Sequence, residues 1–428
     1  MRILLLAQFF PPDYGGEEWH VFNLANALAS RNHQVAVATQ RVPGMPDEEA
    51  LPSGARVYRF ATASMGLPGV YTTGRAHHPP VPDPIGVREL RRIIRQTRPE
   101  VVHAHNWSVN SALPLRGHSS ASRQFGLVLT LHDLSHVCAT KRFMRNGAPC
   151  AGPTMSRCLP CAARYYRGPV GPFTVAANYA MRQWKDRAVD HFVSVSSAVA
   201  KGAGVVGFPN SSIVPNFVPD AVLENRFDAE QTGVELPLPE DPFLLFVGDL
   251  CEEKGILTLL RAYDSMPPDR PPLVLIGKRR PDTPASLPDG AVMYFDWPHE
   301  HVIEAFRRCL YAVAPSIVPD ACPTTVIEAM ACGRPVVATY TGGIVDIVVD
   351  GESGLLVKSG SADELATAMR RLGADSELRA HLAAGAYTRA KSFTASAVVD
   401  RLEEIYRRVA PLRGDVPVPH GVEVREPA

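Results

Sequence analysis

The chain has 428 residues, 46% of them hydrophobic, with 44 basic and 44 acidic side chains. This length is enough for two domains with separate cores, and the absence of an 18-residue apolar run excludes a transmembrane helix. The charges are unevenly distributed, since residues 1–215 hold 23 Lys and Arg against 12 Asp and Glu, and residues 216–428 hold 21 against 32. The excess of 11 positive charges in the first half favours a phosphorylated acceptor or an anionic membrane surface there, or attraction between the halves.

Residues 1–215 alternate short apolar runs with helical patterns, which is typical of a parallel sheet with helices on both faces. The opening sequence passes from an apolar run straight into Pro and Gly, so it predicts a first strand and a cytoplasmic protein rather than a secretory signal. The turn at Gly15 and Gly16 brings the backbone close to whatever fills a cleft. We expect a helix from Glu17 to Ser30 and strands at Ile3–Ala7, Gln34–Thr39, Arg56–Phe60, Val101–Ala104, Leu127–Leu131 and Phe192–Val195.

Residues 61–86 are irregular and rich in Gly and Pro. Long loops in compact α/β domains are usually functional or mobile, so this segment is the candidate acceptor loop, and a surface excursion is the alternative. The side chains expected to be exposed on it are Tyr71, Arg75, His77 and His78.

The next predicted helix, Val87–Arg98, carries basic residues on one side and Leu90, Ile93 and Ile94 on the other. A solvated face is the ordinary interpretation, and a surface resting on the inner face of a membrane is the alternative. The basic residues are Arg88, Arg91, Arg92, Arg95 and Arg98.

Three histidines, His103, His105 and His132, stand at the ends of predicted strands, where open α/β sheets bind ligands. The segment LTLHD at 129–133 resembles a strand-end histidine motif of the family that residues 314–357 identify below. His132, with Asp133 beside it, is therefore the first choice, and His105 and Asn106 are the second. Isolated histidines are more often structural.

Four cysteines follow within a short segment, Cys138, Cys150, Cys158 and Cys161. Four thiolates including a C-x2-C pair could hold a tetrahedral zinc ion, and free thiols are the alternative. Disulfides are not expected in a cytoplasmic protein. The other four cysteines are scattered and are expected to be packing residues.

A polar, Pro-rich passage at 216–242 is the expected connection to a second α/β unit. Its predicted strands are Phe243–Val247, Leu273–Ile276, Val292–Phe295, Leu310–Pro315 and Val336–Thr339, with a helix at His299–Cys309. Ser361 and Glu364 form a capping box that begins further helices, which run to about Val409.

The segment 314–357 places a helix after a strand that ends near Pro315. Pro323 suits the first turn of this helix, and Gly333 with Pro335 closes it. The unpaired N–H groups near Thr324 and Thr325 form a natural phosphate cradle. Asp320 before the helix and Glu328 inside it are acceptors for sugar hydroxyls. Alone, this pair of acids would be interpreted as a helix cap and a surface residue.

The order P-S-x3-D-x2-P-x4-E-A-M-A-x-G-x-P-V-V-A, then G-G and D-G-x2-G-x-L-V, resembles the donor-binding signature of retaining glycosyltransferases of family 4. This resemblance implies the GT-B fold, with two Rossmann-like doubly wound domains facing each other across a cleft. We expect an acceptor domain at 1–215, a donor domain at 216–392, a helix at 393–410 that crosses back, and a disordered tail at 411–428.

The resemblance also implies roles for individual residues. Gly248 and Lys254 match a motif that binds the nucleotide diphosphate, and Gly15 and Gly16 match the loop facing the donor phosphates. Glu328 would hold the ribose, Asp320 would orient the sugar and His132 would contact it from the opposite wall. Two positions depart from the family pattern, because Asp320 stands for Glu and Asp249 for Arg. The basic run Lys278, Arg279 and Arg280 could replace the missing Arg.

The activity implied is a metal-independent, retaining transfer of a hexosyl group from a nucleotide diphosphate sugar to a carbohydrate, lipid-linked or small-molecule acceptor, with no nucleic-acid partner. No cofactor is required, and zinc would be structural. The alternatives are a sugar-nucleotide epimerase or a phosphorylase on the same fold, or a non-catalytic nucleotide-sugar-binding protein.

Overall fold

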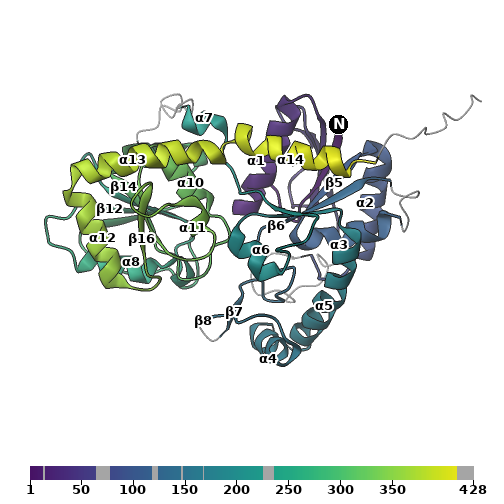
Figure 1. Cartoon of the computed structure of the whole chain (residues 1–428), viewed down its shortest axis with the longest axis horizontal. Coiled ribbons are helices and arrows are strands. Elements are labelled where there is room, and N and C mark those ends of the chain that lie inside the picture. Colours follow the sequence, from purple (N-terminus) through teal and green to yellow (C-terminus); the bar gives the residue numbers. More distant parts are fainter. Residues whose placement is uncertain are drawn as a thin grey trace, which may run out of the picture.

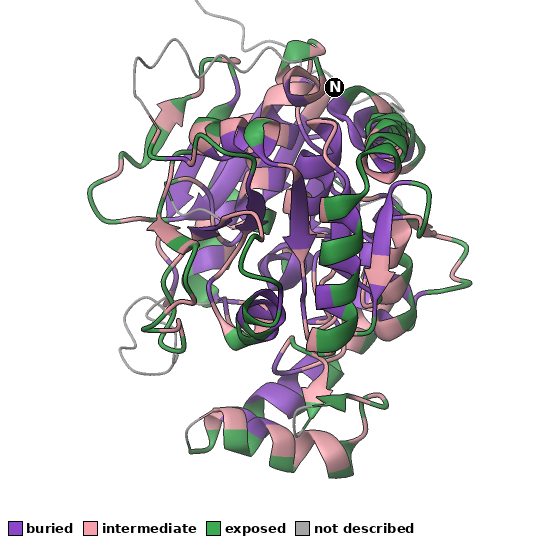
Figure 2. Ribbon diagram, turned by 90° about the vertical axis from the view of Figure 1, so that its left-hand side faces the viewer, coloured by how far each residue is buried: buried purple, intermediate pink, exposed green. Residues whose placement is uncertain are grey.

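The computed structural model describes residues 1–12, 15–63, 78–117, 124–145, 148–166, 168–224 and 236–411. Two parallel sheets form two lobes that lie side by side, each covered by helices (Figure 1). The sheets are the buried centres of the lobes, and exposed residues lie on the outer faces of the helices (Figure 2). The predicted α/β class with two doubly wound units is confirmed.

The first sheet has the strand order β10-β9-β6-β5-β1-β2-β4-β3, and only the edge pair β3–β4 is antiparallel. Its central strands are buried on both faces, which explains why they read as continuous apolar runs. Every strand predicted in this half is present within one residue at each end. The bounds are β1 Arg2–Leu6, β2 Gln34–Gln40, β3 Glu48–Ala50, β4 Arg56–Phe60, β5 Val101–His105, β6 Gly126–Leu131, β9 His191–Ser194 and β10 Ser211–Ile213.

The helices of this lobe include α1 (Gly16–Ser30), α2 (Pro84–Thr97), α3 (Val109–Ala112), α5 (Val170–Ala188) and α6 (Ser197–Ala203). Helix α2 begins three residues before its predicted start because the Asp83 side chain caps it, accepting a hydrogen bond from Gly86 N at 2.8 Å. A small hairpin, β7 (Met144–Arg145) and β8 (Ala148–Pro149), and helix α4 (Met155–Tyr165) project from the lobe beyond α5 (Figure 1).

The second sheet has the order β13-β12-β11-β14-β15-β16, and all its pairs are parallel. Strand β16 was not predicted as a strand, because its four residues lie inside the D-G-x2-G-x-L-V motif. The strands are β11 Leu244–Val247, β12 Leu273–Gly277, β13 Ala291–Phe295, β14 Tyr311–Ala314, β15 Val336–Thr339 and β16 Gly354–Val357. The helices are α8 Ile256–Asp264, α9 His299–Arg308, α10 Thr324–Ala331, α11 Ile344–Ile347, α12 Ala362–Ala374 and α13 Ser376–Ala390.

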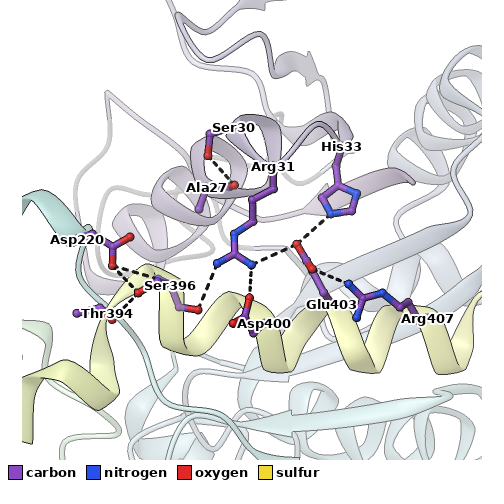
Figure 3. A network of polar contacts seen from close by, with 10 residues as sticks. All are labelled: Ala27, Ser30, Arg31, His33, Asp220, Thr394, Ser396, Asp400, Glu403 and Arg407. Atoms are coloured by element: carbon purple, nitrogen blue, oxygen red, sulfur yellow. Dashed lines mark hydrogen bonds and ion pairs between the residues drawn. The ribbon is translucent and has the colours of Figure 1, made fainter.

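The last helix, α14 (Ala395–Val409), leaves the second lobe and lies beside α1 on the first (Figure 1). Figure 3 shows the polar contacts that hold it there: Arg31 pairs with Asp400 and Glu403, and His33 Nε2 lies 3.1 Å from Glu403 Oε1. The exact domain limits at 215, 216 and 392 remain predictions, and the predicted tail lies, apart from Pro411, outside the described residues.

No helix in the described part of the chain is long and apolar enough to cross a membrane. The surface of α2 has the two sides that its sequence predicts. Leu90, Ile93 and Ile94 are buried, while Arg91 and Arg95 are exposed.

Candidate functional site

The start of α10 lies at the carboxyl end of the second sheet and is shaped by a close backbone contact. Pro323 is the N-cap rather than the first helical residue, so Thr324 opens the helix. Gly343 N donates to Asp320 O at 2.6 Å, and a Cβ atom on Gly343 would collide with the carbonyl oxygen of Ala321. The Gly-Gly turn therefore fixes the loop before the helix, and the free N–H groups of its first turn are held in place.

Lys254 and Asp320, both singled out from the sequence, form an ion pair in front of this helix. The second carboxylate oxygen of Asp320 accepts a hydrogen bond from Ser316 Oγ at 2.5 Å. Burial lowers the pKa of Lys254, but the Asp320 carboxylate outweighs burial and leaves that pKa above its ordinary value. Lys254 is thus a cation at neutral pH, held by an acid that a diphosphate could displace.

Glu328 is buried in α10 and does not contact Asp320. Its Oε1 lies 2.9 Å from Nε2 of His299, the first residue of α9. Burial lowers the pKa of His299, and Glu328 more than offsets this, so the net pKa lies above the ordinary value. The His299 ring also packs on Trp19 of α1, with 4.9 Å between ring centroids, and this contact joins the two lobes.

Asp249, which stands where the family has Arg, also forms an ion pair. Arg280 donates to Asp249 Oδ2 at 2.6 Å, and this hydrogen bond raises the pKa of the guanidinium. Arg279 instead stacks on Phe295, 4.3 Å from its ring centroid. Glycine at 277 lets the ends of β11 and β12 come together, because a Cβ there would collide with the carbonyl oxygen of Gly248. Of the basic run, Arg280 is therefore the side chain that pairs with Asp249, at the position of the missing Arg.

On the first lobe, histidines at the ends of β5 and β6 and on α1 lie together. These three residues, His105, His132 and His20, form the histidine wall. His105 Nδ1 lies 2.8 Å from His132 Nε2, and the ring of His20 packs 4.9 Å from that of His132. Burial, followed by the neighbouring histidines, lowers the pKa of His132 and His105 well below the ordinary value. Burial also lowers the pKa of His20 to about 4. These rings are neutral at pH 7, so they offer hydrogen bonds rather than charge.

Asn106, the second choice from the sequence, links this wall to α1. Its Oδ1 accepts from the backbone N–H of His132 at 3.0 Å, and its Nδ2 donates to Glu17 Oε2 at 2.7 Å. Glu17 Oε1 is buried and has no hydrogen-bond partner among the described residues. Burial, then repulsion from Glu18 and Asp133, raises the pKa of Glu17 to about 8. A carboxyl group that is protonated at neutral pH thus faces the site.

The sequence analysis missed Glu17, His20 and His299. The first two lie just after the Gly15-Gly16 turn, on the first turns of α1, and this proximity was the available signal. Gly15 is the N-cap of α1, and Gly16 has open space around its Cα, so packing does not require glycine at 16. His299 carried no motif, and only the fold brings it to Glu328.

Protonation of Glu17 predicts a pH-dependent stability. Because its folded pKa of about 8 exceeds the ordinary 4.5, folding retains a proton that the unfolded chain loses between these values. The contribution of this proton to the free energy of unfolding is complete below pH 4.5 and is lost as the pH rises through 8. We expect Glu17→Gln to melt increasingly above wild type as pH rises over this range in thermal denaturation. Exposed Glu404→Gln is the control, and an equal difference at all pH values would contradict the assignment.

The acceptor-loop prediction is tested at one residue only. Tyr71, Arg75 and His77 lie outside the described residues. His78 was expected to be exposed, and this was wrong, because it is 3% exposed. Its Nε2 lies 2.8 Å from Ser111 Oγ and its Nδ1 lies 2.7 Å from Pro79 O, so it fastens the start of α2 rather than facing solvent.

In the described part of the chain, one group of three side chains brings its potential metal-binding atoms close together. The rings of His20, His105 and His132 offer nitrogens within 4.8 Å of one another. The four cysteines of the α4 region line a common cavity, and all are free thiols. Of the other four cysteines, Cys309 and Cys322 are buried, as expected for packing residues.

Several contacts hold the lobes around the site. Asn216 Nδ2 donates to Cys322 O at 2.9 Å, in front of α10. Ser197 Oγ donates to Asp346 Oδ1 at 2.7 Å, and Arg142 of the cysteine segment pairs with Glu253, next to Lys254. These contacts keep the start of α10 in a fixed position relative to the first lobe.

Comparison with known proteins agrees with this arrangement. The model for the Glycosyltransferase Family 4 domain matches residues 14–222, and that for Glycosyl transferases group 1 matches residues 228–389. D-inositol 3-phosphate glycosyltransferase 1 of Catenulispora acidiphila is 27% identical over 94% of this chain and 93% of its own. The D-inositol 3-phosphate glycosyltransferase of Thermomonospora curvata is 34% identical over 42% of this chain. The match covers 46%, just under half, of the length of that relative.

Solved structures show the same fold. Sucrose-phosphate synthase from Thermosynechococcus elongatus superposes with a TM-score of 0.70 at 20% identity, covering 95% of this chain and 99% of its own. HepE of Anabaena in complex with UDP superposes with a TM-score of 0.63 at 17% identity, covering 95% and 100%. With both family models matched along the chain and the GT-B fold present, the protein belongs to the family 4 glycosyltransferases.

Proposed function

We propose that the protein transfers a hexosyl group from a nucleotide diphosphate sugar to an acceptor, with retention of anomeric configuration and without a catalytic metal. The observation that supports this most is the start of α10, where Lys254 and Asp320 pair in front of the helix and Glu328 lies about one turn inside it. Helix N-termini bind phosphate through free N–H groups and the helix dipole. A uridine nucleotide is the first donor to try, because HepE, which shares the fold, was solved with UDP and UDP-glucose.

Protein cations would stabilise the leaving diphosphate. Lys254 pairs with Asp320 and Arg280 with Asp249, so a bound diphosphate would exchange one anion for another at each cation. The cations are then already oriented when charge develops on the leaving oxygen. This supply of positive charge at the diphosphate is the reason for proposing catalysis without a metal. Glu328, oriented by His299, would accept hydrogen bonds from the ribose hydroxyls.

The sugar would lie between the two walls. Asp320, released from Lys254 by the diphosphate, would accept from a sugar hydroxyl. His132, neutral at pH 7, would contact the opposite side of the sugar. The acceptor would approach over the first lobe, near Glu17 and Asn106, where a protonated carboxyl group can donate a hydrogen bond without adding charge. We propose retention of the anomeric configuration because the chain belongs to this family.

We propose that the acceptor is a molecule that carries phosphate. The first half of the chain has an excess of 11 positive charges. Relatives are named for D-inositol 3-phosphate and, in Campylobacter jejuni, for a diphospho-undecaprenol-linked sugar. Both names combine a phosphate group with a hydroxyl-bearing acceptor.

The test is release of nucleoside diphosphate from UDP-glucose and related donors in excess EDTA, with and without D-inositol 3-phosphate or a diphospho-undecaprenol-linked sugar. We expect release to depend on the acceptor. An epimerase would change the sugar without an acceptor, a phosphorylase would need inorganic phosphate instead, and a binding protein would bind the donor without turnover. Any of these three outcomes would contradict the proposal.

Peripheral binding to the inner face of the membrane is a further part of the proposal. The side chains of Arg91 and Arg95 are exposed and form no ion pair with the described residues, whereas Arg92 pairs with Glu89. Each basic residue near an anionic leaflet contributes about 1 kcal/mol, and salt screens the attraction. We expect sedimentation with anionic but not neutral vesicles, weakened by salt and by Arg91→Glu/Arg95→Glu. An absence of binding at low salt would leave attraction between the lobes as the explanation of the charge division.

A further inference from the structure

We propose that Cys138, Cys150, Cys158 and Cys161 bind one structural zinc ion, and that this centre holds the turn Lys141–Phe143 against the donor-binding lobe. The centre itself is independent of the proposed function. Only the consequence for the donor rests on the proposed transferase activity.

The four cysteines come from three stretches of chain that the fold brings together. Cys138 lies in the loop after β6, Cys150 follows the hairpin β7–β8, and Cys158 and Cys161 lie one turn apart on α4. All four line one cavity of about 20 Å³. A cavity of this size has room for about one water-sized particle, so it suits a single ion and excludes an organic ligand.

The chemistry of the lining favours zinc. Four sulfur ligands with a C-x2-C pair are a usual tetrahedral zinc set, and none of the four is in a disulfide. Zinc with four thiolates carries two negative charges, and Arg145 and Arg157 line the same cavity. Without a metal, the sulfurs have only weak contacts with nearby oxygens: Cys138 Sγ lies 3.4 Å from Thr140 Oγ1, and Cys161 Sγ lies 3.9 Å from Met144 O. Metal binding would replace these contacts by turning the thiolates inward.

The segment has little else to stabilise it. Its own apolar cluster has only Ala139, Ala162 and Val175 fully buried, and the strands of its hairpin have two residues each. The hairpin and α4 lie away from both sheets (Figure 1), and most residues of α4 are exposed or half-buried. Small units without a sufficient core usually need a metal or disulfides to fold.

The loop between the first two cysteines reaches the site. Lys141 and Phe143 have φ values of 65° and 53°, a left-handed backbone that non-glycine residues adopt only when other contacts hold them. Lys141 Nζ lies 4.4 Å from the centroid of the Trp107 ring, and Arg142 pairs with Glu253, the neighbour of Lys254. A metal that fixes Cys138 and Cys150 would therefore fix this cationic turn at the edge of the donor site.

The experiment is elemental analysis of the full-length protein, purified without chelator. We expect one zinc per chain and no visible absorption. Cys158→Ser/Cys161→Ser and the single variant Cys138→Ser should each retain below 0.1 zinc, while Cys251→Ser, outside the cluster, should retain one. Chelation should expose the segment 138–161 to limited proteolysis while the rest of the chain resists cleavage.

Thiol titration of the wild-type protein, purified without chelator, is the measurement that could overturn the proposal. Wild-type protein without zinc, with cluster thiols that react freely and no protection of the segment, would overturn the proposal, as would bound iron or a disulfide within the cluster. Arg142→Ala should keep its zinc and raise the donor KM about two- to fivefold, as expected for loss of a partly exposed ion pair. Stoichiometric zinc in a protein without transferase activity would refute the proposed function and leave the centre standing.

Discussion

Replacing Lys254 with Ala is expected to lower kcat/KM for sugar transfer by about tenfold to a hundredfold, the loss of one charge-assisted contact to a buried ligand. Lys254 is the cation held in front of α10, paired with Asp320 and adjacent to the free N–H groups of the helix start. Glu328→Gln should cause a loss of similar size. It keeps a hydrogen-bonding group beside His299 but removes the charge that we assign to the ribose contact.

The controls separate catalysis from folding. Lys201→Ala and Glu404→Gln change exposed residues of the same types in α6 and α14, and both should retain full activity. The variants of Lys254 and Glu328 should melt cooperatively, as wild type does. Full activity in both site variants would mean that the donor diphosphate does not lie at α10.

His132→Ala is the second substitution with a large expected effect, about a hundredfold or more in kcat, as for removal of one oriented hydrogen-bonding group from a transition state. Its ring is fixed by His105 and packs on His20, and its backbone N–H is held by Asn106. Because burial and the other histidines keep its pKa well below the ordinary value, His132 itself should contribute no inflection to the pH profile of kcat between pH 6 and 8.

The comparison variant is His191→Ala, at the start of β9, where Nε2 contacts Ser212 Oγ at 2.8 Å. It should keep its activity. His132→Gln should recover part of the loss, because an amide can still donate and accept hydrogen bonds in this position. A His132→Ala enzyme with wild-type kcat would remove this residue from the account.

Much of the fold was predictable because the strands are buried on both faces and are bounded by polar turns. Arg56–Phe60 and Val336–Thr339 were predicted to the residue. The start of α2 was predicted late, since a side-chain cap at Asp83 extends the helix through Pro84 and Gly86. Local patterns therefore find elements more reliably than they find the capping contacts that end them.

The site was predictable where a motif identified it and not where tertiary packing makes it. Lys254, Asp320 and Glu328 came from sequence order, but the pairing of Lys254 with Asp320 depends on two loops that are 66 residues apart. The sequence offered Lys278, Arg279 and Arg280 as replacements for the missing Arg, and only the geometry shows that Arg280 is the one paired with Asp249. The raised pKa of Glu17 depends on burial and on repulsion from Glu18 and Asp133, and both the burial and the approach of Asp133 come from tertiary packing.

Binding of a nucleoside diphosphate without added divalent metal tests the central claim most directly, because it needs no acceptor. A ligand present at a hundred times its Kd stabilises the native state by about 2.7 kcal/mol, a shift of several degrees in the melting temperature. Of UDP, GDP and ADP, we expect at least one to raise the melting temperature of wild type and of Lys201→Ala, and to raise that of Lys254→Ala by much less. The absence of any shift in wild type with all three, or an equal shift in Lys254→Ala, would contradict the assignment of this site.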